Sequence, residues 1–156
     1  MRCYLAGFIC GTKLEECSSW RKRIRMHFAQ KSWDDLIFFD PMNGQAISTI
    51  TTDGLKSSVD PQALFHRDYR AIQESDLIIV NLNTFGETRT PTGTICEIAL
   101  AWEMKKPIII ITDEMQYKAH PFLRYFASAF VKDVDELLEN QLIEYFYRGT
   151  VNPRYE

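Results

Sequence analysis

Two aliphatic runs constrain the fold of this chain more than any other feature. Residues 77–82 (LIIVNL) and 107–111 (PIIII) are apolar along almost their whole length, and not only at every second position. A strand with no polar face must be covered on both sides, which is typical of a parallel sheet between two layers of helices. The segment that separates the two runs has helical periodicity, as the crossover between parallel strands requires.

Strand-like runs alternate with helix-like periodicity along the remaining chain. The further strands are predicted at 2–6 and 36–39, and the helices at 12–31, 61–74, 93–104, 120–127 and 134–146. Residues 40–59 are rich in Ser, Thr, Gly and Asp and are expected to form a long irregular loop. We therefore predict one domain over residues 1–156 with a doubly wound, flavodoxin-like α/β fold. Its five-stranded parallel sheet carries helices on both faces.

The predicted fold also predicts where a ligand binds. In open α/β sheets the site lies beyond the carboxyl ends of the strands, where the winding direction reverses. The loops expected at that edge are 7–12, 40–60, 83–92 and 112–120, and three of the four are polar and rich in small residues.

Composition excludes several classes of partner. The net charge of −3 gives no basic face for nucleic acid, and the basic stretch at 20–25 (WRKRIR) is expected to be a solvated helix face. No apolar run approaches the about 20 residues that span a bilayer. The chain starts directly in a strand-like segment without a signal peptide, so we expect a cytoplasmic protein.

The four cysteines show neither C-x-x-C pairs nor Cys/His metal spacing. We expect free thiols in a reducing compartment, no metal site and no cofactor. Cys96 adjoins Glu97, but no histidine stands at a spacing that supports a cysteine nucleophile, and a small buried thiol is the expected state.

Two carboxylates stand out against their surroundings. Asp68 shares a helical stripe with Leu64, Ala71 and Ile72, where an unpaired carboxylate is costly, and its neighbour Arg67 is expected to point elsewhere. Asp68 therefore either caps or pairs with a distant group or belongs to a site.

Glu97 falls in the early turns of a helix that begins in a Thr/Gly turn. The helix dipole is expected to keep it ionised there, as a nucleophile toward a sugar carbon requires. A glutamate in such a turn is also ordinary helix chemistry, so the pair of carboxylates matters more than either alone.

Three short segments resemble the signature segments of the nucleoside 2-deoxyribosyltransferase family, which includes the 2′-deoxynucleoside 5′-phosphate N-hydrolases. They are residues 4–7 (YLAG), 66–76 (HRDYRAIQESD) and 92–99 (TGTICEIA), in matching order and spacing. The resemblance covers about residues 2–127. It implies a flavodoxin-like enzyme of purine and pyrimidine salvage that needs no cofactor and acts on nucleosides and free nucleobases.

The resemblance also assigns roles to residues. It implies Glu97 as nucleophile, Tyr4 as the tyrosine that hydrogen-bonds it, and Asp68 as the aspartate near base and sugar. In the family a neighbouring subunit completes the site, and the nearest counterpart here is His120, so a homo-oligomer with shared sites is expected. The remaining candidate substrate-binding residues are Gly7, Phe8, Thr92, Gly93 and Phe122.

Some departures from the family pattern affect specificity. The turn at 89–94 (RTPTGT) lacks the Asp that transferases usually carry near Pro91 or Thr92, and Ala99 replaces a Gly. The loop 8–12 (FICGT) lacks the arginine that the nucleotide hydrolases use for phosphate.

The interpretation that follows from these features is cleavage of a 2′-deoxyribonucleoside through a glutamyl intermediate. Two alternatives stay open. A 5′-monophosphate N-hydrolase would take phosphate donors from Arg89, Thr90, Thr92 and the Gly11–Thr12 turn. A non-catalytic nucleotide sensor on the same fold would suit the missing Asp.

Overall fold

The computed structural model describes residues 1–9, 13–31, 33, 35–43, 47–51, 54–57 and 59–147. Its centre is a parallel sheet of five strands in the order β2-β1-β5-β6-β7. The strands are β1 (Arg2–Gly7), β2 (Ile37–Phe39), β5 (Leu77–Asn81), β6 (Ile108–Ile111) and β7 (Ala129–Val131). This confirms the predicted doubly wound sheet and its strand order.

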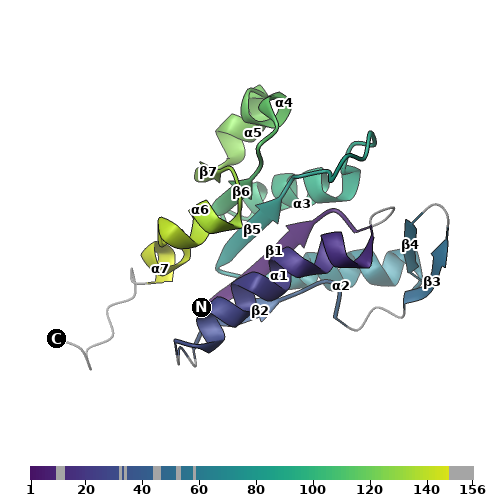
Figure 1. The fold of residues 1–156 in the computed structure, drawn as a ribbon, viewed down its shortest axis with the longest axis horizontal. Coiled ribbons are helices and arrows are strands. Elements are labelled where there is room, and N and C mark those ends of the chain that lie inside the picture. Colours follow the sequence, from purple (N-terminus) through teal and green to yellow (C-terminus); the bar gives the residue numbers. More distant parts are fainter. Residues whose placement is uncertain are drawn as a thin grey trace.

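Helices cover both faces of the sheet (Figure 1). One face packs against α1 (Leu14–Ala29), α6 (Val134–Glu139) and α7 (Leu142–Tyr147), and the other against α2 (Pro61–Glu74), α3 (Thr92–Glu103) and α5 (Pro121–Phe126). The short helix α4 (Met115–Lys118) follows β6.

Strand β1 contributes side chains to the hydrophobic cores on both faces of the sheet. Cys3 and Leu5 lie in the core beneath α1, whereas Tyr4 and Ala6 lie in the core beneath α2 and α3, and all four side chains are fully buried. The alternation follows from the pleat, which points successive side chains to opposite faces. Tyr4 thereby points to the face that carries Asp68 and Glu97.

Helix α2 begins and ends as its sequence predicts. The Asp60 carboxylate accepts hydrogen bonds from the backbone N–H groups of Gln62 and Ala63, and Pro61 occupies the first helical position. Because the first N–H groups of a helix have no partner within it, such a cap fixes where the helix starts.

Four segments differ from the predictions, and one of them is α4, which lies within the predicted loop 112–120. The region 40–59 is not one irregular loop, because its backbone includes an antiparallel pair, β3 (Ile47–Thr51) and β4 (Gly54–Ser57). The single helix predicted at 134–146 is divided into α6 and α7 at Gln141, whose positive φ of 52° ends the first helix. Strand β7 has no counterpart among the segments predicted from sequence. None of the described helices is both long and apolar enough to cross a membrane.

Candidate functional site

The site is built around a hydrogen bond between β1 and α3. The Tyr4 hydroxyl donates to Glu97 Oε1 over 2.5 Å. Tyr4 is fully buried and its ring stacks on Phe39 of β2, with ring centroids 5.4 Å apart. The strand and the stacked ring together leave the hydroxyl little freedom to move away from Glu97.

Asp68 of α2 lies on the same face of the sheet and has a partner that the sequence interpretation had excluded. Arg67 Nε donates to Asp68 Oδ1 at 3.0 Å, and Nη2 forms an ion pair with the same oxygen, also at 3.0 Å. The same guanidinium donates to the carbonyl oxygens of Pro41 (2.7 Å) and Asn43 (3.1 Å). The expectation that Arg67 points away from Asp68 is therefore wrong, and Arg67 ties α2 to the segment after β2.

A cavity of about 560 Å³ brings these groups together at the carboxyl end of β1. Its walls come from the end of β1, from α2, and from the connection into α3. They are formed by Gly7, Phe8, Ile9, Leu64, Asp68, Arg89, Thr90, Pro91, Thr92, Gly93, Thr94 and Glu97. A cavity of similar size, about 520 Å³, lies between β2 and α2 but contains neither Glu97 nor Asp68.

Burial controls the ionisation of Glu97. It raises the pKa of this carboxyl to about 7, with a smaller upward contribution from Asp68 and opposing contributions from the Tyr4 hydrogen bond and the charge of Arg21. The expected stabilisation by the helix N-terminus does not prevail, because α3 begins at Thr92 and Glu97 lies beyond its first turn. Burial also raises the pKa of Asp68, against the lowering effect of Arg67.

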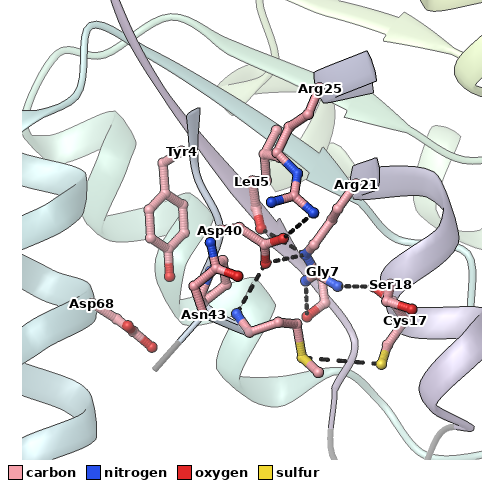
Figure 2. Close-up of polar contacts among 12 residues, drawn as sticks. Tyr4, Leu5, Gly7, Cys17, Ser18, Arg21, Arg25, Asp40, Asn43 and Asp68 are labelled. Carbon is pink, nitrogen blue, oxygen red and sulfur yellow. Dashed lines mark hydrogen bonds and ion pairs between the residues drawn. The ribbon is translucent and has the colours of Figure 1, made fainter. Parts of the chain in front are cut away.

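A buried basic residue missed by the sequence analysis supports the end of β1 (Figure 2). Arg21 of α1 is fully buried, and its guanidinium donates to the carbonyl oxygens of Leu5 (3.2 Å), Gly7 (3.2 Å) and Cys17. Asp40 lies 3.6 Å from Arg21 Nε. The prediction that residues 20–25 form a solvated helix face is thus wrong at Arg21. The sequence did contain a sign of this burial, because Arg21 stands at helical spacing from the apolar residues Cys17, Ile24 and Phe28.

The predicted site residues do not all meet within one chain. Most of them line the cavity, namely Gly7, Phe8, Asp68, Thr92, Gly93 and Glu97. Tyr4 does not line it but hydrogen-bonds Glu97. His120 and Phe122 instead lie at the start of α5, where Phe122 is 67% exposed. Cys96 is exposed and not buried as expected. Gly11 and Thr12 fall outside the described residues.

The described part of the chain contains no group of three or more His, Cys, Asp or Glu side chains that could hold a metal ion. The polar groups that converge on the cavity are two carboxylates, hydroxyls, one guanidinium, and the first turn of α3. Such a set binds a sugar or nucleotide through hydrogen bonds and offers a carboxylate to an electrophilic carbon.

Comparison with known proteins gives a family match over most of the chain. The model of the nucleoside 2-deoxyribosyltransferase family matches residues 3–146. No curated protein matches the sequence.

Among solved structures, a 2-deoxyribosyltransferase from Bacillus psychrosaccharolyticus is similar with a TM-score of 0.65 and 17% identity, over 94% of this chain and 96% of that one. A CMP N-glycosidase from Clostridium botulinum is similar with a TM-score of 0.57 and 19% identity, over 92% of this chain and 99% of that one. A conserved protein from Enterococcus faecalis V583 has a TM-score of 0.64 and 16% identity, over 89% and 95%. At these identities the structural matches show the shared fold.

Proposed function

Because the chain belongs to the nucleoside 2-deoxyribosyltransferase family, we propose that it cleaves the N-glycosidic bond of 2′-deoxyribonucleosides and transfers the deoxyribosyl group to another nucleobase or to water. The observation that carries this proposal is the Tyr4–Glu97 hydrogen bond at the wall of a cavity that also contains Asp68. A carboxylate held in a fixed position beside a cavity of nucleoside size is suited to attack C1′ of a bound sugar.

The reaction proceeds in two displacements. Tyr4 holds Glu97 Oε1, and the other carboxylate oxygen attacks C1′; a C1′–O bond forms as the C1′–N bond breaks, and the departing base takes up a proton from solvent in the open cavity. A nitrogen of a second base, or water, then attacks C1′ from the opposite side, gives up its proton to solvent and releases the Glu97 carboxylate. Two inversions retain the configuration at C1′, as in retaining glycosidases. Asp68 contacts the sugar and base from the α2 side.

The pKa of Glu97 suits this cycle. With a pKa of about 7, an appreciable fraction of the protein carries the ionised nucleophile at neutral pH. The same partial burial at the cavity wall leaves the carboxylate less solvated than it would be in bulk water. A less solvated carboxylate is a stronger nucleophile toward the sugar carbon than one in bulk water.

The test is incubation of the protein with deoxyinosine and adenine, followed by chromatography for hypoxanthine and deoxyadenosine. We expect released or exchanged base from the wild type and none from Glu97→Gln. Glu103→Gln is the matched control, because Glu103 is an exposed glutamate on the same helix. Lack of release and exchange across purine and pyrimidine donors, or an active Glu97→Gln protein, would exclude the proposal.

The cavity also favours a second candidate, hydrolysis of a 2′-deoxynucleoside 5′-monophosphate. Arg89, Thr90 and Thr92 line it beside the first turn of α3. Backbone N–H groups at a helix start attract phosphate, and a CMP N-glycosidase shares the fold. Comparison of kcat/KM for a nucleoside and its monophosphate separates the two candidates. Equal or better turnover of the nucleoside rejects the second.

We also propose that the active protein is a homo-oligomer in which His120 of one copy reaches the site of another. The supporting observation is an aromatic cluster on α3 and α5, in which the exposed rings of Trp102, Phe122 and Tyr125 surround the half-buried ring of Phe126. Tyr125 is 74% and Trp102 41% exposed. Contiguous exposed aromatic side chains are typical of protein interfaces.

A further inference from the structure

We propose that Arg21 is a positioning residue of the site: its buried guanidinium fixes the carboxyl end of β1 and supplies a positive charge behind the Tyr4–Glu97 pair. The inference rests on the proposed function for its consequences in catalysis. Its physical basis is geometric. Arg21 belongs to α1, which covers the face of the sheet opposite to Tyr4, α2 and α3.

The hydrogen bonds of Arg21 connect the elements that meet at the cavity. Its Nε and Nη2 donate to the carbonyl oxygens of Leu5 and Gly7, both at 3.2 Å, and Nη1 donates to that of Cys17 in α1. Leu5 and Gly7 lie on either side of Ala6, just after Tyr4. The cavity wall begins at Gly7, so the guanidinium fixes the backbone from which both Tyr4 and the wall extend.

The packing around Gly7 shows how closely α1 approaches the strand. A Cβ atom on this residue would lie 2.9 Å from a ring carbon of Trp20 and 3.2 Å from Arg21 Nη2. The Arg21 guanidinium also lies over the Trp20 ring, 4.5 Å from its centroid. Only a residue without a side chain permits this approach. Gly7 and Arg21 therefore form one packed contact between β1 and α1.

Asp40, just after β2, adds an ion pair to this contact between β1 and α1. Its carboxylate is buried, lies 3.6 Å from Arg21 Nε and 3.4 Å from Arg25 Nη2, and accepts from the backbone N–H of Met42 at 2.9 Å. Figure 2 shows Arg21 between this carboxylate and the Gly7 carbonyl.

A buried ion pair is poor evidence for stability alone. Desolvation of the two charges offsets most of their attraction, and apolar side chains of similar volume often replace such pairs without loss. A fully buried arginine whose charge acts on the Glu97 carboxyl therefore points to a use for that charge. Burial lowers the pKa of Arg21 and Asp40 raises it again, and a guanidinium stays protonated in proteins.

The groups that act directly on Glu97 come from three elements. Tyr4 of β1 donates to it, Asp68 of α2 opposes its ionisation and is itself paired with Arg67, and Arg21 of α1 favours it. Asp40, at the end of β2, offsets the charge of Arg21. Removal of Arg21 and removal of Asp40 are therefore expected to have opposite effects on Glu97.

The experiment compares pH profiles of kcat/KM for the deoxyribosyl reaction, because this parameter reports groups of the free enzyme. Arg21→Met should raise the apparent pKa assigned to Glu97, and Asp40→Asn, which keeps the oxygen that accepts from Met42, should lower it. We expect shifts of roughly half a unit to one unit. Arg23→Gln is the matched control: Arg23 lies on the same helix, pairs with Asp135 on the surface, and should leave the profile unchanged.

The opposite signs distinguish this role from a merely structural one, which would lower activity in both variants without moving the two profiles apart. Unchanged apparent pKa values in folded Arg21→Met and Asp40→Asn proteins, or shifts of the same sign, would overturn the inference. Should Arg21→Met fail to fold, as judged by circular dichroism, Asp40→Asn decides alone: an acid shift supports the inference and no shift overturns it.

A readout besides activity separates this inference from the proposed function. The carboxyl band of Glu97, assigned by infrared difference against Glu97→Gln, can be titrated in each variant. If the wild type shows no deoxyribosyl chemistry, the proposed function fails, but opposite shifts of this band would still support the electrostatic role of Arg21. A band that titrates identically in all variants would overturn it.

Discussion

The Tyr4 hydroxyl lies 2.5 Å from Glu97 Oε1, although the two residues are 93 positions apart in the sequence. The pKa values of both groups are raised. Burial, followed by the negative charge of Glu97, raises the pKa of Tyr4 well above its ordinary value. The phenol therefore stays protonated whenever Glu97 is ionised, and it acts as the donor to the carboxylate.

The pH dependence of the reaction should follow Glu97. Only the carboxylate attacks C1′, so kcat/KM is expected to rise with pH and to reach half of its plateau near the Glu97 pKa of about 7. The measurement is initial rates of base release across the range in which the wild type remains folded. A profile that is flat through neutrality, or that falls as pH rises, would contradict Glu97 as the nucleophile.

Tyr4→Phe should weaken catalysis in a specific way. The hydrogen bond lowers the pKa of Glu97, so its loss should move the pH profile to higher pH. A hydrogen bond to a charged group contributes about 1.5–3 kcal/mol, so kcat should fall roughly 10- to 100-fold. Tyr69→Phe, on α2 and outside the cavity, is the control. Equal rates and profiles for Tyr4→Phe and wild type would argue against the pair.

Glu97 should also make stability depend on pH. Its pKa rises from 4.5 to about 7 on folding, so its contribution to stability is present below about pH 4.5 and is lost as pH rises through about 7. The side chain of the Glu97→Gln variant cannot ionise. As pH rises through that window, the free energy of unfolding of this variant should therefore increase relative to wild type, by on the order of 2 kcal/mol. Thermal or urea unfolding at several pH values measures the gain. A difference that is constant with pH would show that Glu97 ionises freely.

Gly7 offers a test of the packing that surrounds the site. Gly7→Ala would place a methyl group against Trp20 and Arg21 and should destabilise the fold by about 1–3 kcal/mol. Gly93→Ala is the matched control, because a Cβ there meets nothing within 4 Å, and it should be neutral or slightly stabilising. Similar unfolding midpoints for the two variants would show that the chain relaxes easily around Gly7.

The shared site predicts complementation between inactive proteins. Glu97→Gln and His120→Ala should each be inactive alone and should regain activity when mixed, because a hybrid interface pairs an intact Glu97 with an intact His120. Phe122→Ser should weaken self-association, since this ring is largely exposed on one chain. Light scattering measures the assembly and base exchange the activity. An active monomer, or a fully active His120→Ala protein, would exclude the shared site.

The sequence was sufficient for four of the five strands and for the class of the fold, because apolar strands and amphipathic helices are local patterns, whereas the short strand β7 was missed. It also located Glu97 and Asp68, which stand out as carboxylates in apolar surroundings. The ionisation of Glu97 and the pairing of Arg67 with Asp68 could not be predicted, because burial and side-chain direction depend on elements far apart in the chain. The β3–β4 pair was missed although Ile47–Thr51 is rich in β-branched residues and an Asp-Gly dipeptide follows at 53–54.

The walls of the cavity come from two kinds of backbone. Asp68 and Glu97 belong to α2 and α3, and Glu97 is held by Tyr4 of β1, whereas Phe8, Ile9 and residues 89–91 belong to the connections. Under the proposed function, bond cleavage and substrate choice belong to separate parts of the chain. Exchange of the connection before α3 should redirect this scaffold to another base or sugar phosphate while the nucleophile stays in place. Under the proposed function, a new substrate therefore requires changes in these connections and none in the strand and helices that carry Tyr4, Asp68 and Glu97.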